Sequence, residues 1–122
     1  MGYRIDANQN IWRVVFSRTL TNSDLLEIVQ KIKTIDTNNP VAPDGIVDMR
    51  DLDNIDLGFS DVNSFDESVR GHSLPNNVKV ALLADRPIQY GFARMFQTLF
   101  NHPQVELEVI EDEKDALEWL SK

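Results

Sequence analysis

Residues 78–84 place the strongest constraint on the fold of this chain. Six of these seven residues are apolar, and Lys79 is the exception. A short apolar run without alternation is typical of a parallel strand that is covered on both faces. Parallel neighbours are joined by crossover connections, usually helices, and the segment therefore predicts an α/β domain.

The rest of the chain alternates between strand-like and helix-like segments. The order ββαβαβαβα predicts one domain over residues 1–122, with a mostly parallel sheet of about five strands, an opening β-hairpin and four helices. The predicted strands cover residues 3–6, 11–16, 46–49, 78–84 and 105–109, with a turn at residues 7–10 and loops at residues 36–45 and 50–59. The last strand alternates strictly, which favours an edge position with one solvated face.

Capping residues and apolar spacing predict the helices. Thr21 is expected to cap the first helix together with Asp24, and Ser60 the second, which Gly71 ends. Asp85 and Pro87 start the third, which reaches about residue 100, and Asp112 and Asp115 open the fourth. The residues expected to face the core are Leu25, Ile28, Val29, Ile32, Ile35, Val62, Phe65, Val69, Ala116, Leu117, Trp119 and Leu120.

Composition and motifs exclude several classes of function. The net charge of −8 argues against a nucleic-acid partner, and the absence of cysteine excludes thiolate catalysis and Cys-ligated metals. Residues 51–56 begin like a calcium loop, but Ile55 stands at a ligand position and Asp56 where glycine is needed. His72 and His102 lack a partner at metal-ligand spacing, and no nucleophile elbow or glycine-rich phosphate loop occurs. We therefore predict no enzyme, no metal and no cofactor, with an enzyme as the third-ranked alternative.

Several segments in this order resemble the SpoIIAA-like family, relatives of the STAS domain of anti-sigma-factor antagonists. They are the opening hairpin and residues 46–50 (IVDMR), 79–83 (KVALL), 89–96 (QYGFARMF) and 116–120 (ALEWL). STAS switches carry Asp-Ser-Ser-Gly eight residues after an Asp on the central strand. The spacing from Asp48 to Asp56 is similar, but Gly58 stands at the phosphoacceptor position and has no hydroxyl, which argues against that switch.

The resemblance also implies a likeness to lipid-carrying domains of the SEC14 type, and hence hydrophobic-ligand binding and membrane association. The helix that starts at Pro87 has a broad apolar arc, and residues 71–104, which contain it, carry three basic and one acidic residue. We therefore expect a hydrophobic small molecule or lipid as partner, and peripheral contact with the inner face of the membrane by a cytoplasmic protein. The expected apolar surface is Phe92, Met95, Phe96, Leu99 and Phe100, with Arg94 as a polar anchor at its rim.

Other interpretations stay open at this point. The arc of the helix is also the arrangement expected for residues that only fill the core. Asp48 and Arg50 lie two apart on a strand and point to one face, where they form either a ligand head-group site or a structural ion pair. The alternative function is a STAS-type regulatory module that docks a protein through the loop from Asp56 to Ser60. A homodimer is a further partner state left open.

Overall fold

The computed structural model describes residues 3–8, 11–35 and 40–122 and confirms the predicted order of elements. The predicted turn and first loop lie partly outside these ranges. The strands are β1 (Tyr3–Asn8), β2 (Ile11–Thr21), β3 (Asp44–Asp56), β4 (Val78–Leu83) and β5 (Val105–Ile110). The helices are α1 (Asn22–Lys33), α2 (Phe59–Arg70), α3 (Pro87–Leu99) and α4 (Glu113–Leu120).

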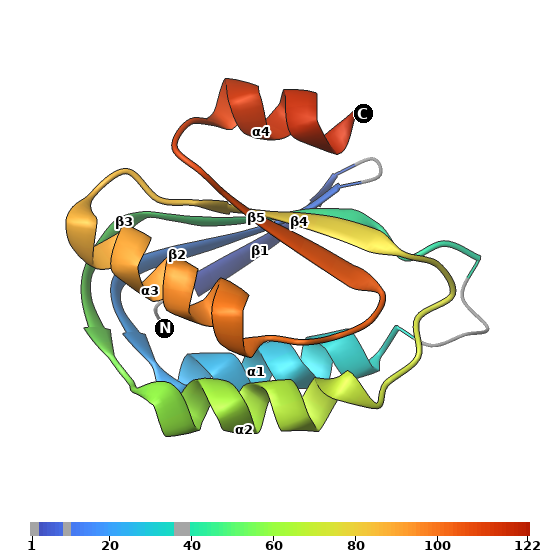
Figure 1. The fold of residues 1–122 in the computed structure, drawn as a ribbon, viewed down its shortest axis with the longest axis horizontal. Coiled ribbons are helices and arrows are strands. Elements are labelled where there is room, and N and C mark those ends of the chain that lie inside the picture. Colours follow the sequence, from blue (N-terminus) through green and yellow to red (C-terminus); the bar gives the residue numbers. More distant parts are fainter. Residues whose placement is uncertain (1–2, 9–10, 36–39) are drawn as a thin grey trace.

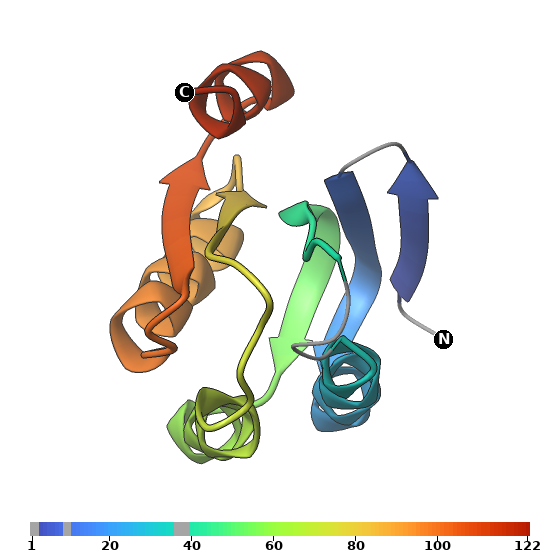
Figure 2. The same cartoon turned by 90° about the vertical axis from the view of Figure 1, so that its right-hand side faces the viewer.

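The strands form one sheet in the order β1-β2-β3-β4-β5. β1 and β2 pair antiparallel as a hairpin, and the three other pairings are parallel, as predicted. Helices α1, α2 and α3 cover one face of the sheet, and α4 covers the other by itself (Figure 1). The view along the sheet shows β5 at the edge opposite β1 (Figure 2).

The alternation of side chains on β2 separates the two layers. Phe16 and Val14 face α1–α3 and belong to the larger core cluster, whereas Ile11 packs into the cluster beneath α4. Arg13, on the same face as Ile11, pairs with Glu113 on α4. Successive side chains of β2 therefore lie alternately in the layer of α1–α3 and in the layer of α4.

The helix caps follow the sequence at α1 but not at α2. Thr21 Oγ1 accepts from the Asp24 N–H at 3.4 Å, and Asp24 Oδ2 accepts from the Thr21 N–H at 3.0 Å, the predicted capping box. The prediction for Ser60 is wrong, because α2 begins two residues earlier and Gly58 is its N-cap. Asp61 Oδ2 accepts from the Gly58 N–H at 3.0 Å and takes over the capping function.

Strand β3 is much longer than predicted, and the expected loop over residues 50–59 is wrong for most of its length. Val15 pairs with Asp48 and Ser17 with Asp51, so β3 contains one extra residue between these pairs. A second extra residue follows, since Arg18 pairs with Leu52 and the next residue of β2 with Asn54. Such bulges interrupt the two-residue alternation by which a strand is recognised in sequence.

Smaller differences concern single residues. Ala7 and Asn8, predicted in the turn, belong to β1, and Asp44 and Gly45 belong to β3 rather than to the preceding loop. Leu117 was expected in the core but is 43% exposed, because α4 turns only one narrow side to the sheet. Ala116 and Leu120 are buried there as predicted.

Candidate functional site

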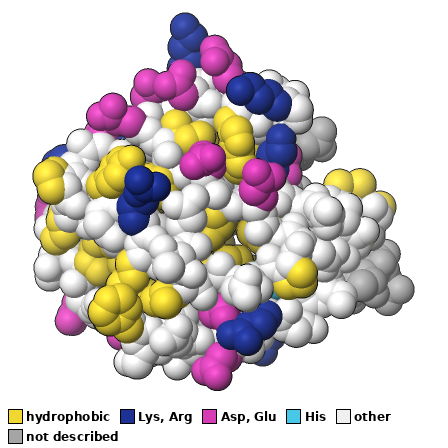
Figure 3. All heavy atoms as spheres, in the orientation of Figure 1, with side chains coloured by type: hydrophobic (Ala, Val, Ile, Leu, Met, Phe, Trp, Pro, Cys, Tyr) yellow, Lys and Arg dark blue, Asp and Glu magenta, His cyan; other side chains and the backbone are white. Residues whose placement is uncertain are grey.

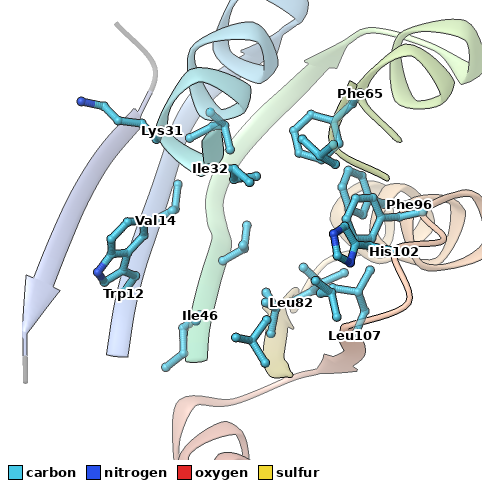
Figure 4. Close-up of a pocket in the computed structure, with 18 of the residues that line it drawn as sticks. Trp12, Val14, Lys31, Ile32, Ile46, Phe65, Leu82, Phe96, His102 and Leu107 are labelled. Atoms are coloured by element: carbon cyan, nitrogen blue, oxygen red, sulfur yellow. The ribbon is translucent and has the colours of Figure 1, made fainter. Parts of the chain in front are cut away.

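An apolar cavity of about 190 Å³ lies between the sheet and the helices α1, α2 and α3. It extends across the sheet from β1 and α1 to β5, with side chains of both layers turned toward it (Figure 4). Among the described residues, only Lys31 has a charged side chain in its lining, and His102 adds an imidazole. A space with this lining favours apolar ligands over water, which needs polar partners.

Four short residues of the central strands make a part of the lining that we call the floor of the cavity, and larger strand residues such as Trp12 and Phe16 line it beside them. Val14 on β2, Gly45 and Val47 on β3, and Val80 on β4 line it from the sheet. A Cβ added at Gly45 would stand 3.7 Å from a methyl group of Val80, which is ordinary contact. Valine and glycine at these positions leave space that longer side chains would fill.

Three phenylalanines form an aromatic wall: Phe65 of α2, Phe96 of α3, and Phe100 at the C-cap of α3. The ring centroids of Phe65 are 5.4 Å from Phe96 and 5.7 Å from Phe100, and those of Phe96 and Phe100 are 5.3 Å apart. Phe92 extends the wall at 6.1 Å from Phe96. Ring pairs at these separations stabilise one another beyond the area they bury, which holds α2 and α3 together at the cavity.

His102 lines the cavity from the segment that precedes β5. Its Nδ1 accepts from the Gln104 N–H at 3.1 Å, and its Nε2 lies 2.7 Å from the carbonyl oxygen of His72. Since Nδ1 accepts, we assign the proton to Nε2, which donates to that carbonyl. Both ring nitrogens are thus engaged with backbone, and the ring face stacks on Phe100 at 6.4 Å.

The residues predicted on α3 divide into three groups. Phe92, Phe96 and Phe100 line the cavity. Met95 and Leu99 pack against the main core cluster beside it. Arg94 is exposed, does not line the cavity, and lies over the Tyr90 ring at 5.5 Å from its centroid. The apolar surface of the helix is therefore directed mainly inward.

Asp48 and Arg50 lie on the opposite face of the sheet, beneath α4. Arg50 donates from Nε to Asp48 Oδ1 at 2.9 Å and from Nη2 to Asp48 Oδ2 at 2.8 Å. Arg13 Nη1 donates to the same carboxylate at 3.3 Å, and both arginines reach Glu113. The predicted pair thus belongs to a cluster of two basic and two acidic residues that ties α4 to β2 and β3.

The charges in this cluster shift two pKa values. Burial raises the pKa of the Asp48 carboxyl, but the hydrogen bonds from the Arg50 side chain and backbone and the positive charges of both arginines outweigh it, so that this pKa is lowered. The hydrogen bond to Asp48 raises the pKa of Arg50. The mutual stabilisation of these charges supports a structural function for the pair.

Asp56 and Ser60 are exposed and do not line the cavity; they lie at the end of β3 and the start of α2. Between them Phe59 is 67% exposed. The part of the chain that the structure describes contains no group of three or more acidic or histidine residues arranged to hold a metal ion. It also contains no helix long and apolar enough to cross a membrane.

Sequence reasoning did not find the floor of the cavity, Lys31 or the position of His102. Lys31 follows Ile28 by three residues and precedes Ile35 by four, and helical spacing therefore places it at the edge of the apolar stripe of α1. That spacing is a usable signal. The cavity arises from the distance between the helices and the sheet, and the sequence of a single helix or strand does not indicate that distance.

Comparison with known proteins supports the fold. No protein-family model matches the chain, and the search of curated proteins gave no match either. Among solved structures, the chain is similar to a protein of the DUF3478 family with a SpoIIAA-like fold from Shewanella loihica PV-4. The TM-score is 0.62 at 20% sequence identity, over 97% of this chain and 91% of that chain. The chain therefore has a SpoIIAA-like fold, as its sequence predicts.

Proposed function

We propose that this protein is a non-enzymatic binding module for a small hydrophobic molecule, held between the sheet and helices α1–α3. The single observation that carries the proposal is the apolar cavity of about 190 Å³. Its lining contains three of the five apolar residues predicted from sequence to bind such a ligand, Phe92, Phe96 and Phe100. Hydrophobic lining with few polar groups is the usual composition of a small-molecule site.

The volume limits the size of the ligand. An engineered apolar cavity of about 150 Å³ stays dry and accepts one benzene molecule. By proportion, this cavity holds about eight non-hydrogen atoms. Pockets that enclose drug-sized ligands measure roughly 300–1,000 Å³, so a whole diacyl lipid does not fit and a single short chain or ring does.

The test is calorimetric titration of the protein with 1-octanol, paired with the substitution Gly45→Leu. The first added carbon of a side chain at Gly45 is accommodated without a clash, and the remaining atoms of leucine would occupy the cavity. We expect saturable binding at one site in the wild type and in the matched control Gly45→Ala, and a loss of about tenfold or more in Gly45→Leu. Val47→Phe is a second filling variant for the case that Gly45→Leu does not fold. Absence of saturable binding in the wild type would overturn the proposal, as would undiminished binding by a folded filling variant.

Peripheral membrane contact through α3 stays a separate prediction. The larger apolar side chains that α3 turns to solvent are Ile88 and Tyr90. Figure 3 shows hydrophobic side chains on the part of the surface over α3, whereas charged side chains gather around α4. Co-flotation of the protein with anionic vesicles tests this contact. We expect Ile88→Asp to reduce the fraction of protein that floats, and Leu117→Asp on α4 to leave that fraction unchanged.

A second candidate function is a regulatory module that docks a protein partner at the start of α2. The exposure of Phe59 and of Ser60 beside it favours this alternative. The first turn of a helix stabilises a phosphate, and a phosphorylated Ser60 in protein from the native host would support regulation at this position. Unmodified Ser60, together with octanol binding, would favour the binding module.

A further inference from the structure

We infer that the ligand of the cavity is a short-chain monocarboxylate, with its alkyl chain between sheet and helices and its carboxylate at Lys31. The inference rests on the proposed function and adds the chemical class of the ligand. It starts from the position of one cation at the edge of a lining that is otherwise apolar in the described residues.

Lys31 lies in the last turn of α1, next to Ile32, which points into the cavity. Figure 4 shows its side chain at the α1–β1 side of the cavity, with the ammonium nitrogen directed away from the interior. The aliphatic part of the side chain contributes to the lining while the charge stays in solvent, as is common for lysine at an apolar boundary. A ligand that enters with its chain first would leave its polar end beside this ammonium group.

The neighbours of Lys31 leave its charge available. Glu27, one helical turn earlier, accepts a hydrogen bond from the Tyr3 hydroxyl at 2.9 Å. Within the described ranges, Lys31 takes part in no ion pair. An anionic head group would therefore not have to displace a carboxylate that the structure shows on this lysine.

Other polar groups near the cavity are engaged elsewhere. Both ring nitrogens of His102 bond to the backbone, at the end of the cavity opposite Lys31. Arg94 lies on the outer side of α3 over Tyr90. A single lysine supplies one positive charge, which balances one carboxylate but only part of the charge of a doubly ionised phosphate.

The size of the cavity sets the chain length. With about eight non-hydrogen atoms inside and the carboxylate outside at Lys31, the alkyl part has roughly seven or eight carbons. Octanoate, with seven carbons besides its carboxylate, is the probe of matching size. Such a chain would lie along the sheet from Lys31 toward the Phe96 end of the aromatic wall (Figure 4).

The experiment compares octanoate with 1-octanol, which has the same chain length and no charge. Both are titrated by calorimetry into the wild type, Lys31→Met and Lys33→Met. Methionine keeps most of the aliphatic stem and removes the charge. Lys33 is the matched control, because it is also an exposed lysine in the last turn of α1 but does not line the cavity.

We expect Lys31→Met to weaken octanoate binding by about fivefold, the effect of one solvent-exposed ion pair. Octanol binding should stay within about twofold in both variants, and Lys33→Met should leave octanoate binding unchanged. Equal losses of octanoate binding in the two lysine variants would overturn the inference, as would an unchanged affinity in Lys31→Met. If octanol still binds in those cases, the proposed function stands; if neither compound binds the wild type, both fail.

Discussion

The rings of Phe65 on α2 and Phe96 on α3 pack with their centroids 5.4 Å apart, so that two helices share one aromatic wall. We predict that Phe96→Ala lowers the free energy of unfolding by about 3 kcal/mol, because it removes this contact and enlarges the cavity. Urea denaturation measures the loss. The control Phe59→Ala, at a side chain 67% exposed, should change stability by less than about 0.5 kcal/mol. Similar losses in both variants would contradict the packing described for Phe96.

Gln89 connects the start of α3 to β3 and is completely buried. Its Nε2 donates to the carbonyl oxygens of Arg50 and Leu52, both at 3.0 Å, and its Oε1 accepts from the Asp85 N–H at 3.1 Å. Gln89→Leu keeps most of the volume but removes all three hydrogen bonds. Arg86 Nη2 also donates to the carbonyl oxygens of Arg50 and Leu52, at 3.2 and 2.6 Å, so it is the Asp85 N–H that loses its partner. We expect a destabilisation of about 1–2 kcal/mol in thermal or urea unfolding. A loss below about 0.5 kcal/mol would show that other groups satisfy this backbone.

The ion-pair cluster beneath α4 predicts a specific dependence of stability on pH. The folded-state pKa of Asp48 is lowered from an unfolded value of about 3.9. Its contribution is therefore present above about pH 4 and is lost as pH falls through the lower folded pKa. Asp48→Asn should cost about 2 kcal/mol at pH 7 and progressively less below pH 4, because the wild type then loses the same interaction. Urea unfolding at several pH values measures the difference, and a cost that is constant down to pH 2 would contradict this assignment.

Arg18 has a φ of 65° and lies at the second register shift between β2 and β3. A β-branched residue is strongly disfavoured in this left-handed region, whereas asparagine tolerates it. We predict that Arg18→Val destabilises the protein by about 1–2 kcal/mol and that Arg18→Asn does so by less than half as much. Thermal unfolding of the two variants makes the comparison. Equal stabilities would show that the strand relaxes to a different register.

The fold was largely predictable because each element carries its own local signal. The two-residue alternation of β2, the capping box of Thr21 and Asp24, and the apolar run of β4 each identify an element without reference to its neighbours. Strand β3 was recognised only in part, since its two extra residues depend on the pairing with β2 and leave no regular pattern. Leu117 was misassigned for a related reason: helical spacing defines a face but not how narrow its contact with the sheet is.

Only the α3 side of the candidate site could be predicted from the sequence. The apolar arc of α3 indicated an excess of hydrophobic side chains, and Phe92, Phe96 and Phe100 do line the cavity. The floor of the cavity depends on residues such as Val14, Gly45 and Val47, which come from two strands and meet only in the folded sheet. The same limit applies to Lys31. Its sequence context shows an exposed lysine on a helix, and only the folded structure shows that a cavity lies beside it.

Whenever no ligand occupies it, the cavity adds volume to the folded state that unfolding removes. Hydrostatic pressure is therefore expected to unfold the ligand-free domain more readily than a fully packed domain of equal length. A ligand bound in the cavity would counteract that effect. The pressure needed to unfold the domain therefore measures whether the cavity is occupied, without any label on the ligand.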